Sequence, residues 1–119
     1  MDERLEKAID FSNYIVTLNN QKRLLNEEYE ENLLHYFDGG QFTITKELIT
    51  FVGLLVNAEN TEDVVLTDDN NIPIKIEDLA KFYEDVMDCY FSASNRYHTK
   101  YNILKKQRSV EALVGIDID

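Results

Sequence analysis

The stretch from Cys89 to Val110 carries the residue types best suited to contact a polyanion. It contains no acidic residue, although the whole chain has a formal net charge of -11. Cations pair with phosphates and aromatic rings stack on unpaired bases, so this mixture could bind single-stranded nucleic acid. The candidate contact residues for nucleic acid or another partner are Arg96, Tyr97, Lys100, Tyr101, Lys105, Lys106 and Arg108.

These cations also have a purely structural explanation. Positive charge near the C-terminus of a helix is favourable, and it can pair with acidic residues on a neighbouring helix. The acidic N-terminal residues Asp2, Glu3, Glu6 and Asp10 are the expected partners. Because a net charge of -11 repels nucleic acid and anionic membranes, we favour this structural explanation.

Acidic residues could bind a divalent metal or act as acid and base, and several runs of them occur. The run Asp68-Asp69-Asn70-Asn71 lacks the alternating ligands, the glycine and the final glutamate of a calcium-binding loop. Charge runs on helices and turns are usually solvated faces. We therefore expect no metal site.

Histidine and cysteine chemistry is not indicated either. His35 and His98 lie far apart in the sequence, which disfavours a joint site. Cys89 lies in an apolar stretch, where burial raises the pKa of a thiol and lowers its reactivity. No phosphate-binding glycine loop, nucleophile elbow or Cys/His cluster occurs in the sequence. We expect no catalytic residue, no cofactor and no enzymatic activity.

A long helix is predicted from about residue 3 to residue 37. Phe11, Leu18 and Leu25 recur every seven positions, and a parallel row of side chains lies beside them. This spacing is typical of a helix packed lengthwise on another helix. Gly39 and the glycine after it are expected to end the helix.

A short amphipathic helix is predicted over residues 45–57, with Thr43 or Thr45 as its N-cap. Its β-branched residues leave a strand open as the alternative. The apolar positions that recur at helical spacing are Ile44, Leu48, Phe51, Val52, Leu55 and Val56.

A β-hairpin is predicted over residues 63–76. Its turn is the run of turn-forming residues from Asp68 to Asn71, and apolar residues alternate after it. Pro73 lacks a backbone donor, so its strand is expected at an edge, or with that position turned away from pairing.

A second long helix is predicted over residues 78–114, with Asp78 near its N-cap and Gly115 just past its end. Its first half is apolar on several faces and is expected to be buried on several sides. Its second half has a single aromatic seam. The positions at heptad spacing are Tyr83, Tyr90, Tyr97 and Leu104.

The predicted fold is therefore a single, mainly α domain. Two long antiparallel helices form a coiled-coil-like stem, and the short helix and the β-hairpin pack at one end. If residue 37 lies near residue 79, Lys22 faces Ser94 across the stem. Such a stem buries one face of each helix, and the remaining aromatics Tyr14, Phe82 and Phe91 are expected to favour self-association.

Composition bounds the cellular setting. A chain of 119 residues with 44% hydrophobic content is long enough for one ordinary domain with a core. The single cysteine cannot form an internal disulfide, which fits a reducing compartment. The charged N-terminus does not read as a signal peptide, and no run approaches the roughly 20 apolar residues of a membrane span. We expect a cytoplasmic protein without membrane contact.

Three segments resemble a family of small proteins encoded by T4-like marine cyanophages. They are FSNYIVTLNNQKR (residues 11–23), LITFVGLL (residues 48–55) and YFSASNRYHTKYNILKKQRSV (residues 90–110). The resemblance spans most of the chain and implies a phage protein made in a bacterial cytoplasm. It supplies no catalytic or binding residues.

Two functions remain as hypotheses. The first is a non-enzymatic, self-associating interaction or structural protein of a phage, which acts through helix packing on itself or on a phage or host protein. The second is a small nucleic-acid-binding accessory protein that uses the basic end of the C-terminal helix.

Overall fold

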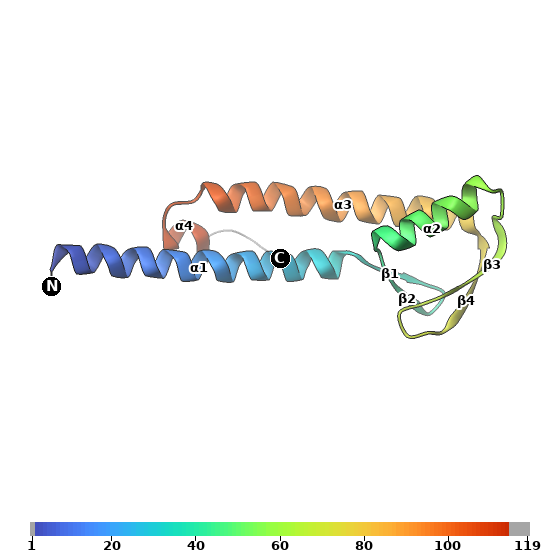
Figure 1. Ribbon diagram of the computed structural model, residues 1–119, viewed down its shortest axis with the longest axis horizontal. Coiled ribbons are helices and arrows are strands. Elements are labelled where there is room, and N and C mark those ends of the chain that lie inside the picture. The colour runs from blue at the N-terminus through green and yellow to red at the C-terminus, as the bar shows by residue number, and fades with distance from the viewer. Residues whose placement is uncertain (1, 115–119) are drawn as a thin grey trace. The chain divides into compact units, whose positions relative to one another are not determined.

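The computed structural model describes residues 2–114, and this part of the chain is mainly helical, with two small β-hairpins (Figure 1). The predicted class, in which two long antiparallel helices accompany a short helix and a β-hairpin, is confirmed, but the sequence did not predict the second hairpin. In chain order the elements are α1 (Glu3–Asn32), β1 (Leu34–Phe37), β2 (Gly40–Thr43), α2 (Lys46–Asn57), β3 (Glu62–Thr67), β4 (Pro73–Asp78), α3 (Leu79–Lys106) and α4 (Val110–Val114).

The described residues fall into two compact units. Unit 1 comprises residues 2–29 and 95–114, and unit 2 comprises residues 30–94. Helices α1 and α3 each contribute residues to both units.

In unit 2, α1 ends at Asn32 rather than at residue 37 as predicted. The chain turns directly into the β1–β2 hairpin, in which residue 34 pairs with residue 43 and residue 37 with residue 40. The loop residues Asp38 and Gly39 have φ values of 50° and 79°. A two-residue hairpin loop of this kind favours Asp-Gly, because both positions need positive φ. The glycines therefore belong to a hairpin and not to a helix end.

The hairpin predicted at residues 63–76 is confirmed as the antiparallel pair β3–β4. Pro73 is the first residue of β4 and pairs with Thr67 at the end of the ladder, where a missing backbone donor is tolerated. The loop between the strands reaches the first hairpin, because the backbone N–H of Asp69 donates to the carbonyl of Gln41 at 2.8 Å.

The predicted helix at residues 45–57 is confirmed as α2, which excludes the strand alternative. Thr45 is its N-cap, and the Thr45 hydroxyl accepts a hydrogen bond from the backbone N–H of Leu48 at 3.1 Å. Asp78 caps α3 in the same way, because its carboxylate accepts from the backbone N–H of Lys81 at 3.1 Å. Both predicted caps therefore start helices as expected.

The core of unit 2 is organised around Phe82 of α3. The ring of Phe82 lies 5.4 Å from that of Phe37 and 5.3 Å from that of Phe42, both edge-on. Phe82 was expected to be left over for another surface, and that prediction was wrong, because the unpredicted β1–β2 hairpin covers it. The buried apolar residues are Phe42, Ile44, Val52, Leu66, Ile74, Ile76, Leu79, Phe82 and Val86.

In unit 1, α3 ends at Lys106, so the prediction of one helix to residue 114 was wrong. The Tyr14 hydroxyl donates to the backbone carbonyl of Gln107 at 2.8 Å, and the chain then turns into α4. The Ser109 hydroxyl accepts from the backbone N–H of Ala112 at 3.2 Å, which gives α4 its own start. The break buries Leu113 beside Leu25 and Leu104. The predicted end at Gly115 lies outside the described residues.

Within unit 1, α1 and α3 run antiparallel, as predicted (Figure 1). The predicted register was wrong, because Lys22 lies over the ring of Tyr101, with 5.8 Å between its Nζ and the ring centroid, and not opposite Ser94. The error follows from the helix end, since the register assumed a first helix that continued to residue 37.

Candidate interaction surfaces

Two basic residues of α3 are held by one carboxylate of α1. Glu28 accepts from the Arg96 Nε at 2.8 Å and from the Lys100 Nζ at 3.1 Å. The side chain of Glu28 is only 11% exposed and that of Lys100 only 16%. Pairing across the helices was expected, but with the acidic residues near the N-terminus. Glu28 is the partner because the helices pack in a different register.

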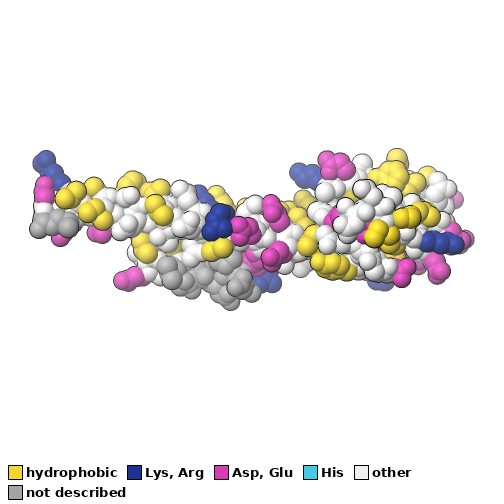
Figure 2. Space-filling view, turned by 90° about the horizontal axis from the view of Figure 1, so that it is seen from below, with side chains coloured by type: hydrophobic (Ala, Val, Ile, Leu, Met, Phe, Trp, Pro, Cys, Tyr) yellow, Lys and Arg dark blue, Asp and Glu magenta, His cyan; other side chains and the backbone are white. Residues whose placement is uncertain are grey.

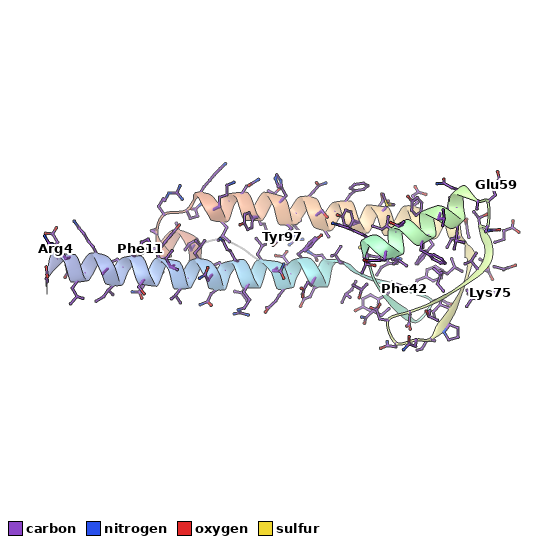
Figure 3. The ribbon with its side chains drawn as sticks, viewed as in Figure 1. Arg4, Phe11, Phe42, Glu59, Lys75 and Tyr97 are labelled. Atoms are coloured by element: carbon purple, nitrogen blue, oxygen red, sulfur yellow. The ribbon has the colours of Figure 1, made fainter. Side chains whose placement is uncertain are left out.

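The two predicted stacking tyrosines take part in the helix contact. The ring of Tyr97 stacks on that of Tyr29, with centroids 4.5 Å apart, and lies edge-on to Tyr101 at 6.2 Å. Figure 3 shows Tyr97 between α1 and α3. The Tyr29 contact covers one face of the Tyr97 ring, so that face is not open to an unpaired base.

The remaining cations lie at the end of α3. The Arg108 Nη1 donates to the carbonyls of Lys105 at 2.9 Å and Gln107 at 3.3 Å, and so satisfies groups that a helix end leaves unpaired. Lys105 and Lys106 are exposed in the last turn. Among the described residues, no carboxylate lies within ion-pair distance of either lysine.

The sequence analysis missed an apolar surface at the start of α1. Residues 2–13 are all exposed, although the helix begins at Glu3. Leu5 is 52% exposed, Ile9 42% and Val16 56%. With Ser12 these three residues follow the spacing i, i+4, i+7, i+11, which places them on one face of a helix. We call Leu5, Ile9, Ser12 and Val16 the α1 stripe.

The figures show how open this part of unit 1 is. On the face drawn in Figure 2, hydrophobic side chains in yellow lie along the N-terminal end of the chain. Figure 3 labels Arg4 and Phe11 on the same stretch, and no other described element of unit 1 runs beside α1 at Arg4. The signal was present in the sequence, but the row Phe11, Leu18, Leu25 obscured it.

The turn that begins at Asp68 is built to hold its carboxylate. Asp68 is 6% exposed, and its carboxylate accepts from the backbone N–H groups of Ile72 at 2.8 Å, Asn70 at 2.9 Å and Gln41 at 3.1 Å. The hydrogen bond from Ile72, followed by those from Gln41 and Asn70, outweighs burial and holds the pKa of Asp68 below its usual value.

Asp69 lies beside it and binds strand β2. Its carboxylate accepts from the Thr43 hydroxyl at 2.6 Å, from the Thr43 backbone at 3.0 Å and from the Gln41 side chain at 3.0 Å. Burial opposes the charged form, but the hydrogen bonds from Thr43 and Gln41 prevail and lower the pKa of Asp69. Both carboxylates thus connect the hairpins.

Other potentially reactive groups are engaged in packing. Burial raises the pKa of the Cys89 thiol, whose Sγ donates to the carbonyl of Asn32 at 3.2 Å. His35 lies against Phe82, with ring centroids 5.7 Å apart. Across residues 2–114 there is no group of three or more His, Cys, Asp or Glu side chains placed to hold a metal ion.

Comparison with known proteins adds no identity. No family model matches the chain, and neither a curated protein nor a solved structure matches it significantly. In the part of the chain that the structure describes, no helix is both long enough and apolar enough to cross a membrane.

Proposed function

We propose that this protein is a non-enzymatic interaction protein that associates with itself through the first turns of α1. The observation that carries the proposal is the exposure of residues 2–13 in a helix that presents Leu5, Ile9 and Val16 on one face. An isolated helical segment of this length is marginal in water, and apolar packing is what normally stabilises it. Resemblance to the cyanophage proteins supports a phage structural or interaction role.

Nucleic-acid binding is the weaker candidate. Arg96 and Lys100 share Glu28, and Arg108 satisfies carbonyls at the end of α3. Lys105 and Lys106 alone give a small cationic surface on a chain with net charge -11, whereas binding to a phosphate backbone depends on several neutralising contacts.

Light scattering at increasing protein concentration tests the proposal. We expect the mass to rise above that of one chain, and the Ile9→Lys variant to remain a monomer because a charge would enter the contact. Ile9 is 42% exposed, so this change should leave the fold of the single chain intact.

Phe11→Lys is the matched control, because it makes the same change from an apolar side chain to lysine at a residue that is 66% exposed and lies about 200° around the helix from Ile9, so this variant should still associate. A wild-type protein that stays monomeric at high concentration would contradict the proposal.

A further inference from the structure

The connection between α3 and α4 contains no residue that must end a helix. Residues 105–113 include neither glycine nor proline, and most of them are residue types that favour helices. The backbone N–H of Gln107 donates to the carbonyl of Leu104 at 3.2 Å, so the chain makes one more tight turn before α3 is lost. The local sequence therefore does not by itself require α3 to end at Lys106.

Side chains of α1 hold α4 in its folded-back position. The Tyr14 hydroxyl donates to the carbonyl of Gln107 at 2.8 Å, and the Gln21 side chain donates to the carbonyl of Leu113 at 2.9 Å. Leu113 is fully buried and packs in the cluster that contains Leu25. Figure 1 shows α4 lying against α1 after the chain has turned back from the end of α3. The break in the helix thus depends on contacts with α1.

A surface of α1 lies beyond the end of α3, on the side where α3 packs. Lys7 and Phe11 are within about 40° of Leu18 around the helix. Tyr14 and Leu25 are within the same arc, and both pack in the cluster formed with α3 and α4. Phe11 is 66% exposed and the Lys7 side chain 78% exposed. This side of α1 is opposite the α1 stripe.

A continued α3 would cover this surface. The carbonyl of Gln107 already lies at Tyr14, and antiparallel helices have the same rise per residue, so Glu111 would come to about the level of Phe11. Glu111 follows Leu104 by seven positions, which is close to two helical turns, and so points to the same side of α3. That side is the one that packs on α1, because Leu104 is buried in the shared cluster.

Opposing terms stabilise the two positions of this segment. Folding back buries Leu113, which favours the observed arrangement. It also places Glu111 in a cleft that Asp10 lines from α1, so like charges share that cleft. In a continued helix, Glu111 would lie over the side of α1 that carries Lys7, where the charges attract.

We propose that residues 107–113 form a conformational switch. In one state they fold back as α4, which buries Leu113 and leaves Phe11 exposed. In the other state they continue α3 along the first turns of α1, which covers Phe11 and uncovers Leu25 and Leu104. The switch determines which of the two apolar surfaces the helix pair presents. It does not depend on the proposed self-association, because the α1 stripe lies on the other side of α1.

NMR with a spin label tests the switch. All proteins carry Ile9→Lys to exclude association through the α1 stripe, together with Cys89→Ser and a nitroxide attached at Arg4→Cys. Residue 113 lies at Gln21 when α4 is folded back, which is about 25 Å along α1 from the label. In the continued helix, residue 113 would lie within about 10 Å of the level of the label.

Two variants release α4. Leu113→Asn removes the buried side chain, and Tyr14→Phe removes the hydroxyl that binds the carbonyl of Gln107. In Leu113→Asn we expect the Cα chemical shifts of residues 107–109 to move to helical values, and the amide signal of residue 113 to be lost through the label. Tyr14→Phe should shift the same signals in the same direction by a smaller amount.

Tyr101→Phe is the matched control, because it removes a tyrosine hydroxyl from the same helix pair but not the one that binds Gln107. Its signals should match those of the parent protein. Random-coil shifts across residues 107–113 in the release variants would overturn the proposal, because α4 would then have melted without extending α3. Unchanged shifts in both variants would overturn it as well. Neither result bears on self-association, which light scattering tests separately.

Discussion

The carboxylates of Asp68 and Asp69 show how much one turn can do in a chain rich in acidic residues. Each accepts three hydrogen bonds, and each binds strand β2 of the other hairpin through Gln41 or Thr43. A calcium loop needs carboxylates that point together at one centre. Here the oxygens are taken by protein donors, so this pair of aspartates holds two hairpins together.

The stability of the folded protein should depend on pH through these two residues. Because hydrogen bonds lower the pKa of Asp68 and Asp69 in the folded state, the unfolded chain takes up protons first as the pH falls. Their stabilising contribution is complete above the ordinary value of 3.8 and is lost as the pH drops through the lower folded-state values. Urea midpoints measured from about pH 6 down to about pH 2 should fall most steeply at the acidic end.

The Asp68→Asn variant provides the comparison. We expect it to be less stable than the wild type at neutral pH, since an amide nitrogen in that position would face backbone donors. The difference in urea midpoint between the two proteins should narrow at low pH, where the wild-type carboxylate is protonated and has lost its charge. A difference in urea midpoint that stays constant across the pH range would show that the charge of Asp68 does not contribute to stability.

At the scale of helices and strands, the sequence predicted most reliably the features that depend on a few neighbouring residues. Asp78 was identified as a cap, and Thr45 was one of two candidates, because an oxygen three positions before a backbone N–H is enough to form a cap. The hairpin at β3–β4 was predictable from its cluster of turn formers. The Asp38-Gly39 pair was an equally local signal, but a long heptad pattern running into it led to a helix prediction.

The features that sequence reasoning missed depend on distant residues. The break after α3 requires Tyr14 to reach the carbonyl of Gln107, and nothing near Gln107 in the sequence reveals that partner. The choice of Glu28 by Arg96 and Lys100 depends on the helix register, which in turn depends on where α1 ends. One wrong boundary therefore displaced the predicted contacts along the whole helix pair.

The contact between the two hairpins makes a second prediction, at Gly40 of β2. A Cβ at this position would lie 2.9 Å from Cγ1 of Ile74 and 3.3 Å from the Oδ2 of Asp68. Both neighbours are buried and cannot move away cheaply. We expect Gly40→Ala to lower the free energy of unfolding by about 1–3 kcal/mol, measured by urea denaturation.

Gly53 in α2 is the control for this substitution. A Cβ there would lie 3.2 Å from the hydroxyl oxygen of Tyr83 and 3.3 Å from its ring, a tight contact but with the end of a side chain. Alanine also favours the helix by up to about 1 kcal/mol over glycine. Gly53→Ala should therefore be close to neutral, and a loss as large as that at Gly40 would argue against a specific contact between the hairpins.

For the whole molecule, we predict a single unfolding transition. The core around Phe82 belongs to unit 2 and the cluster around Leu25 to unit 1. Helices α1 and α3 run without interruption from one unit into the other, so melting either unit breaks helical hydrogen bonds at the border of the other. The prediction of one domain, made from chain length, is consistent with this expectation.

Calorimetry with two variants tests whether the protein unfolds in a single transition. Phe82→Ala and Leu25→Ala should each cost roughly 3–5 kcal/mol and shift the same transition to lower temperature. Two separate transitions, each responding to only one of the variants, would show that the units unfold independently.

Unit 1 is assembled from two chain segments that are separated by the whole of unit 2. During synthesis, the partners of α1 in α3 and α4 leave the ribosome last, so the seam formed by Leu18 and Leu25 stays uncovered until residue 113 is available. Unit 2 can fold before that, because its contacts lie within residues 30–94. If two copies associate through α1 as proposed, nascent chains on one messenger present bare α1 helices to one another, and we expect assembly to begin before either chain is finished.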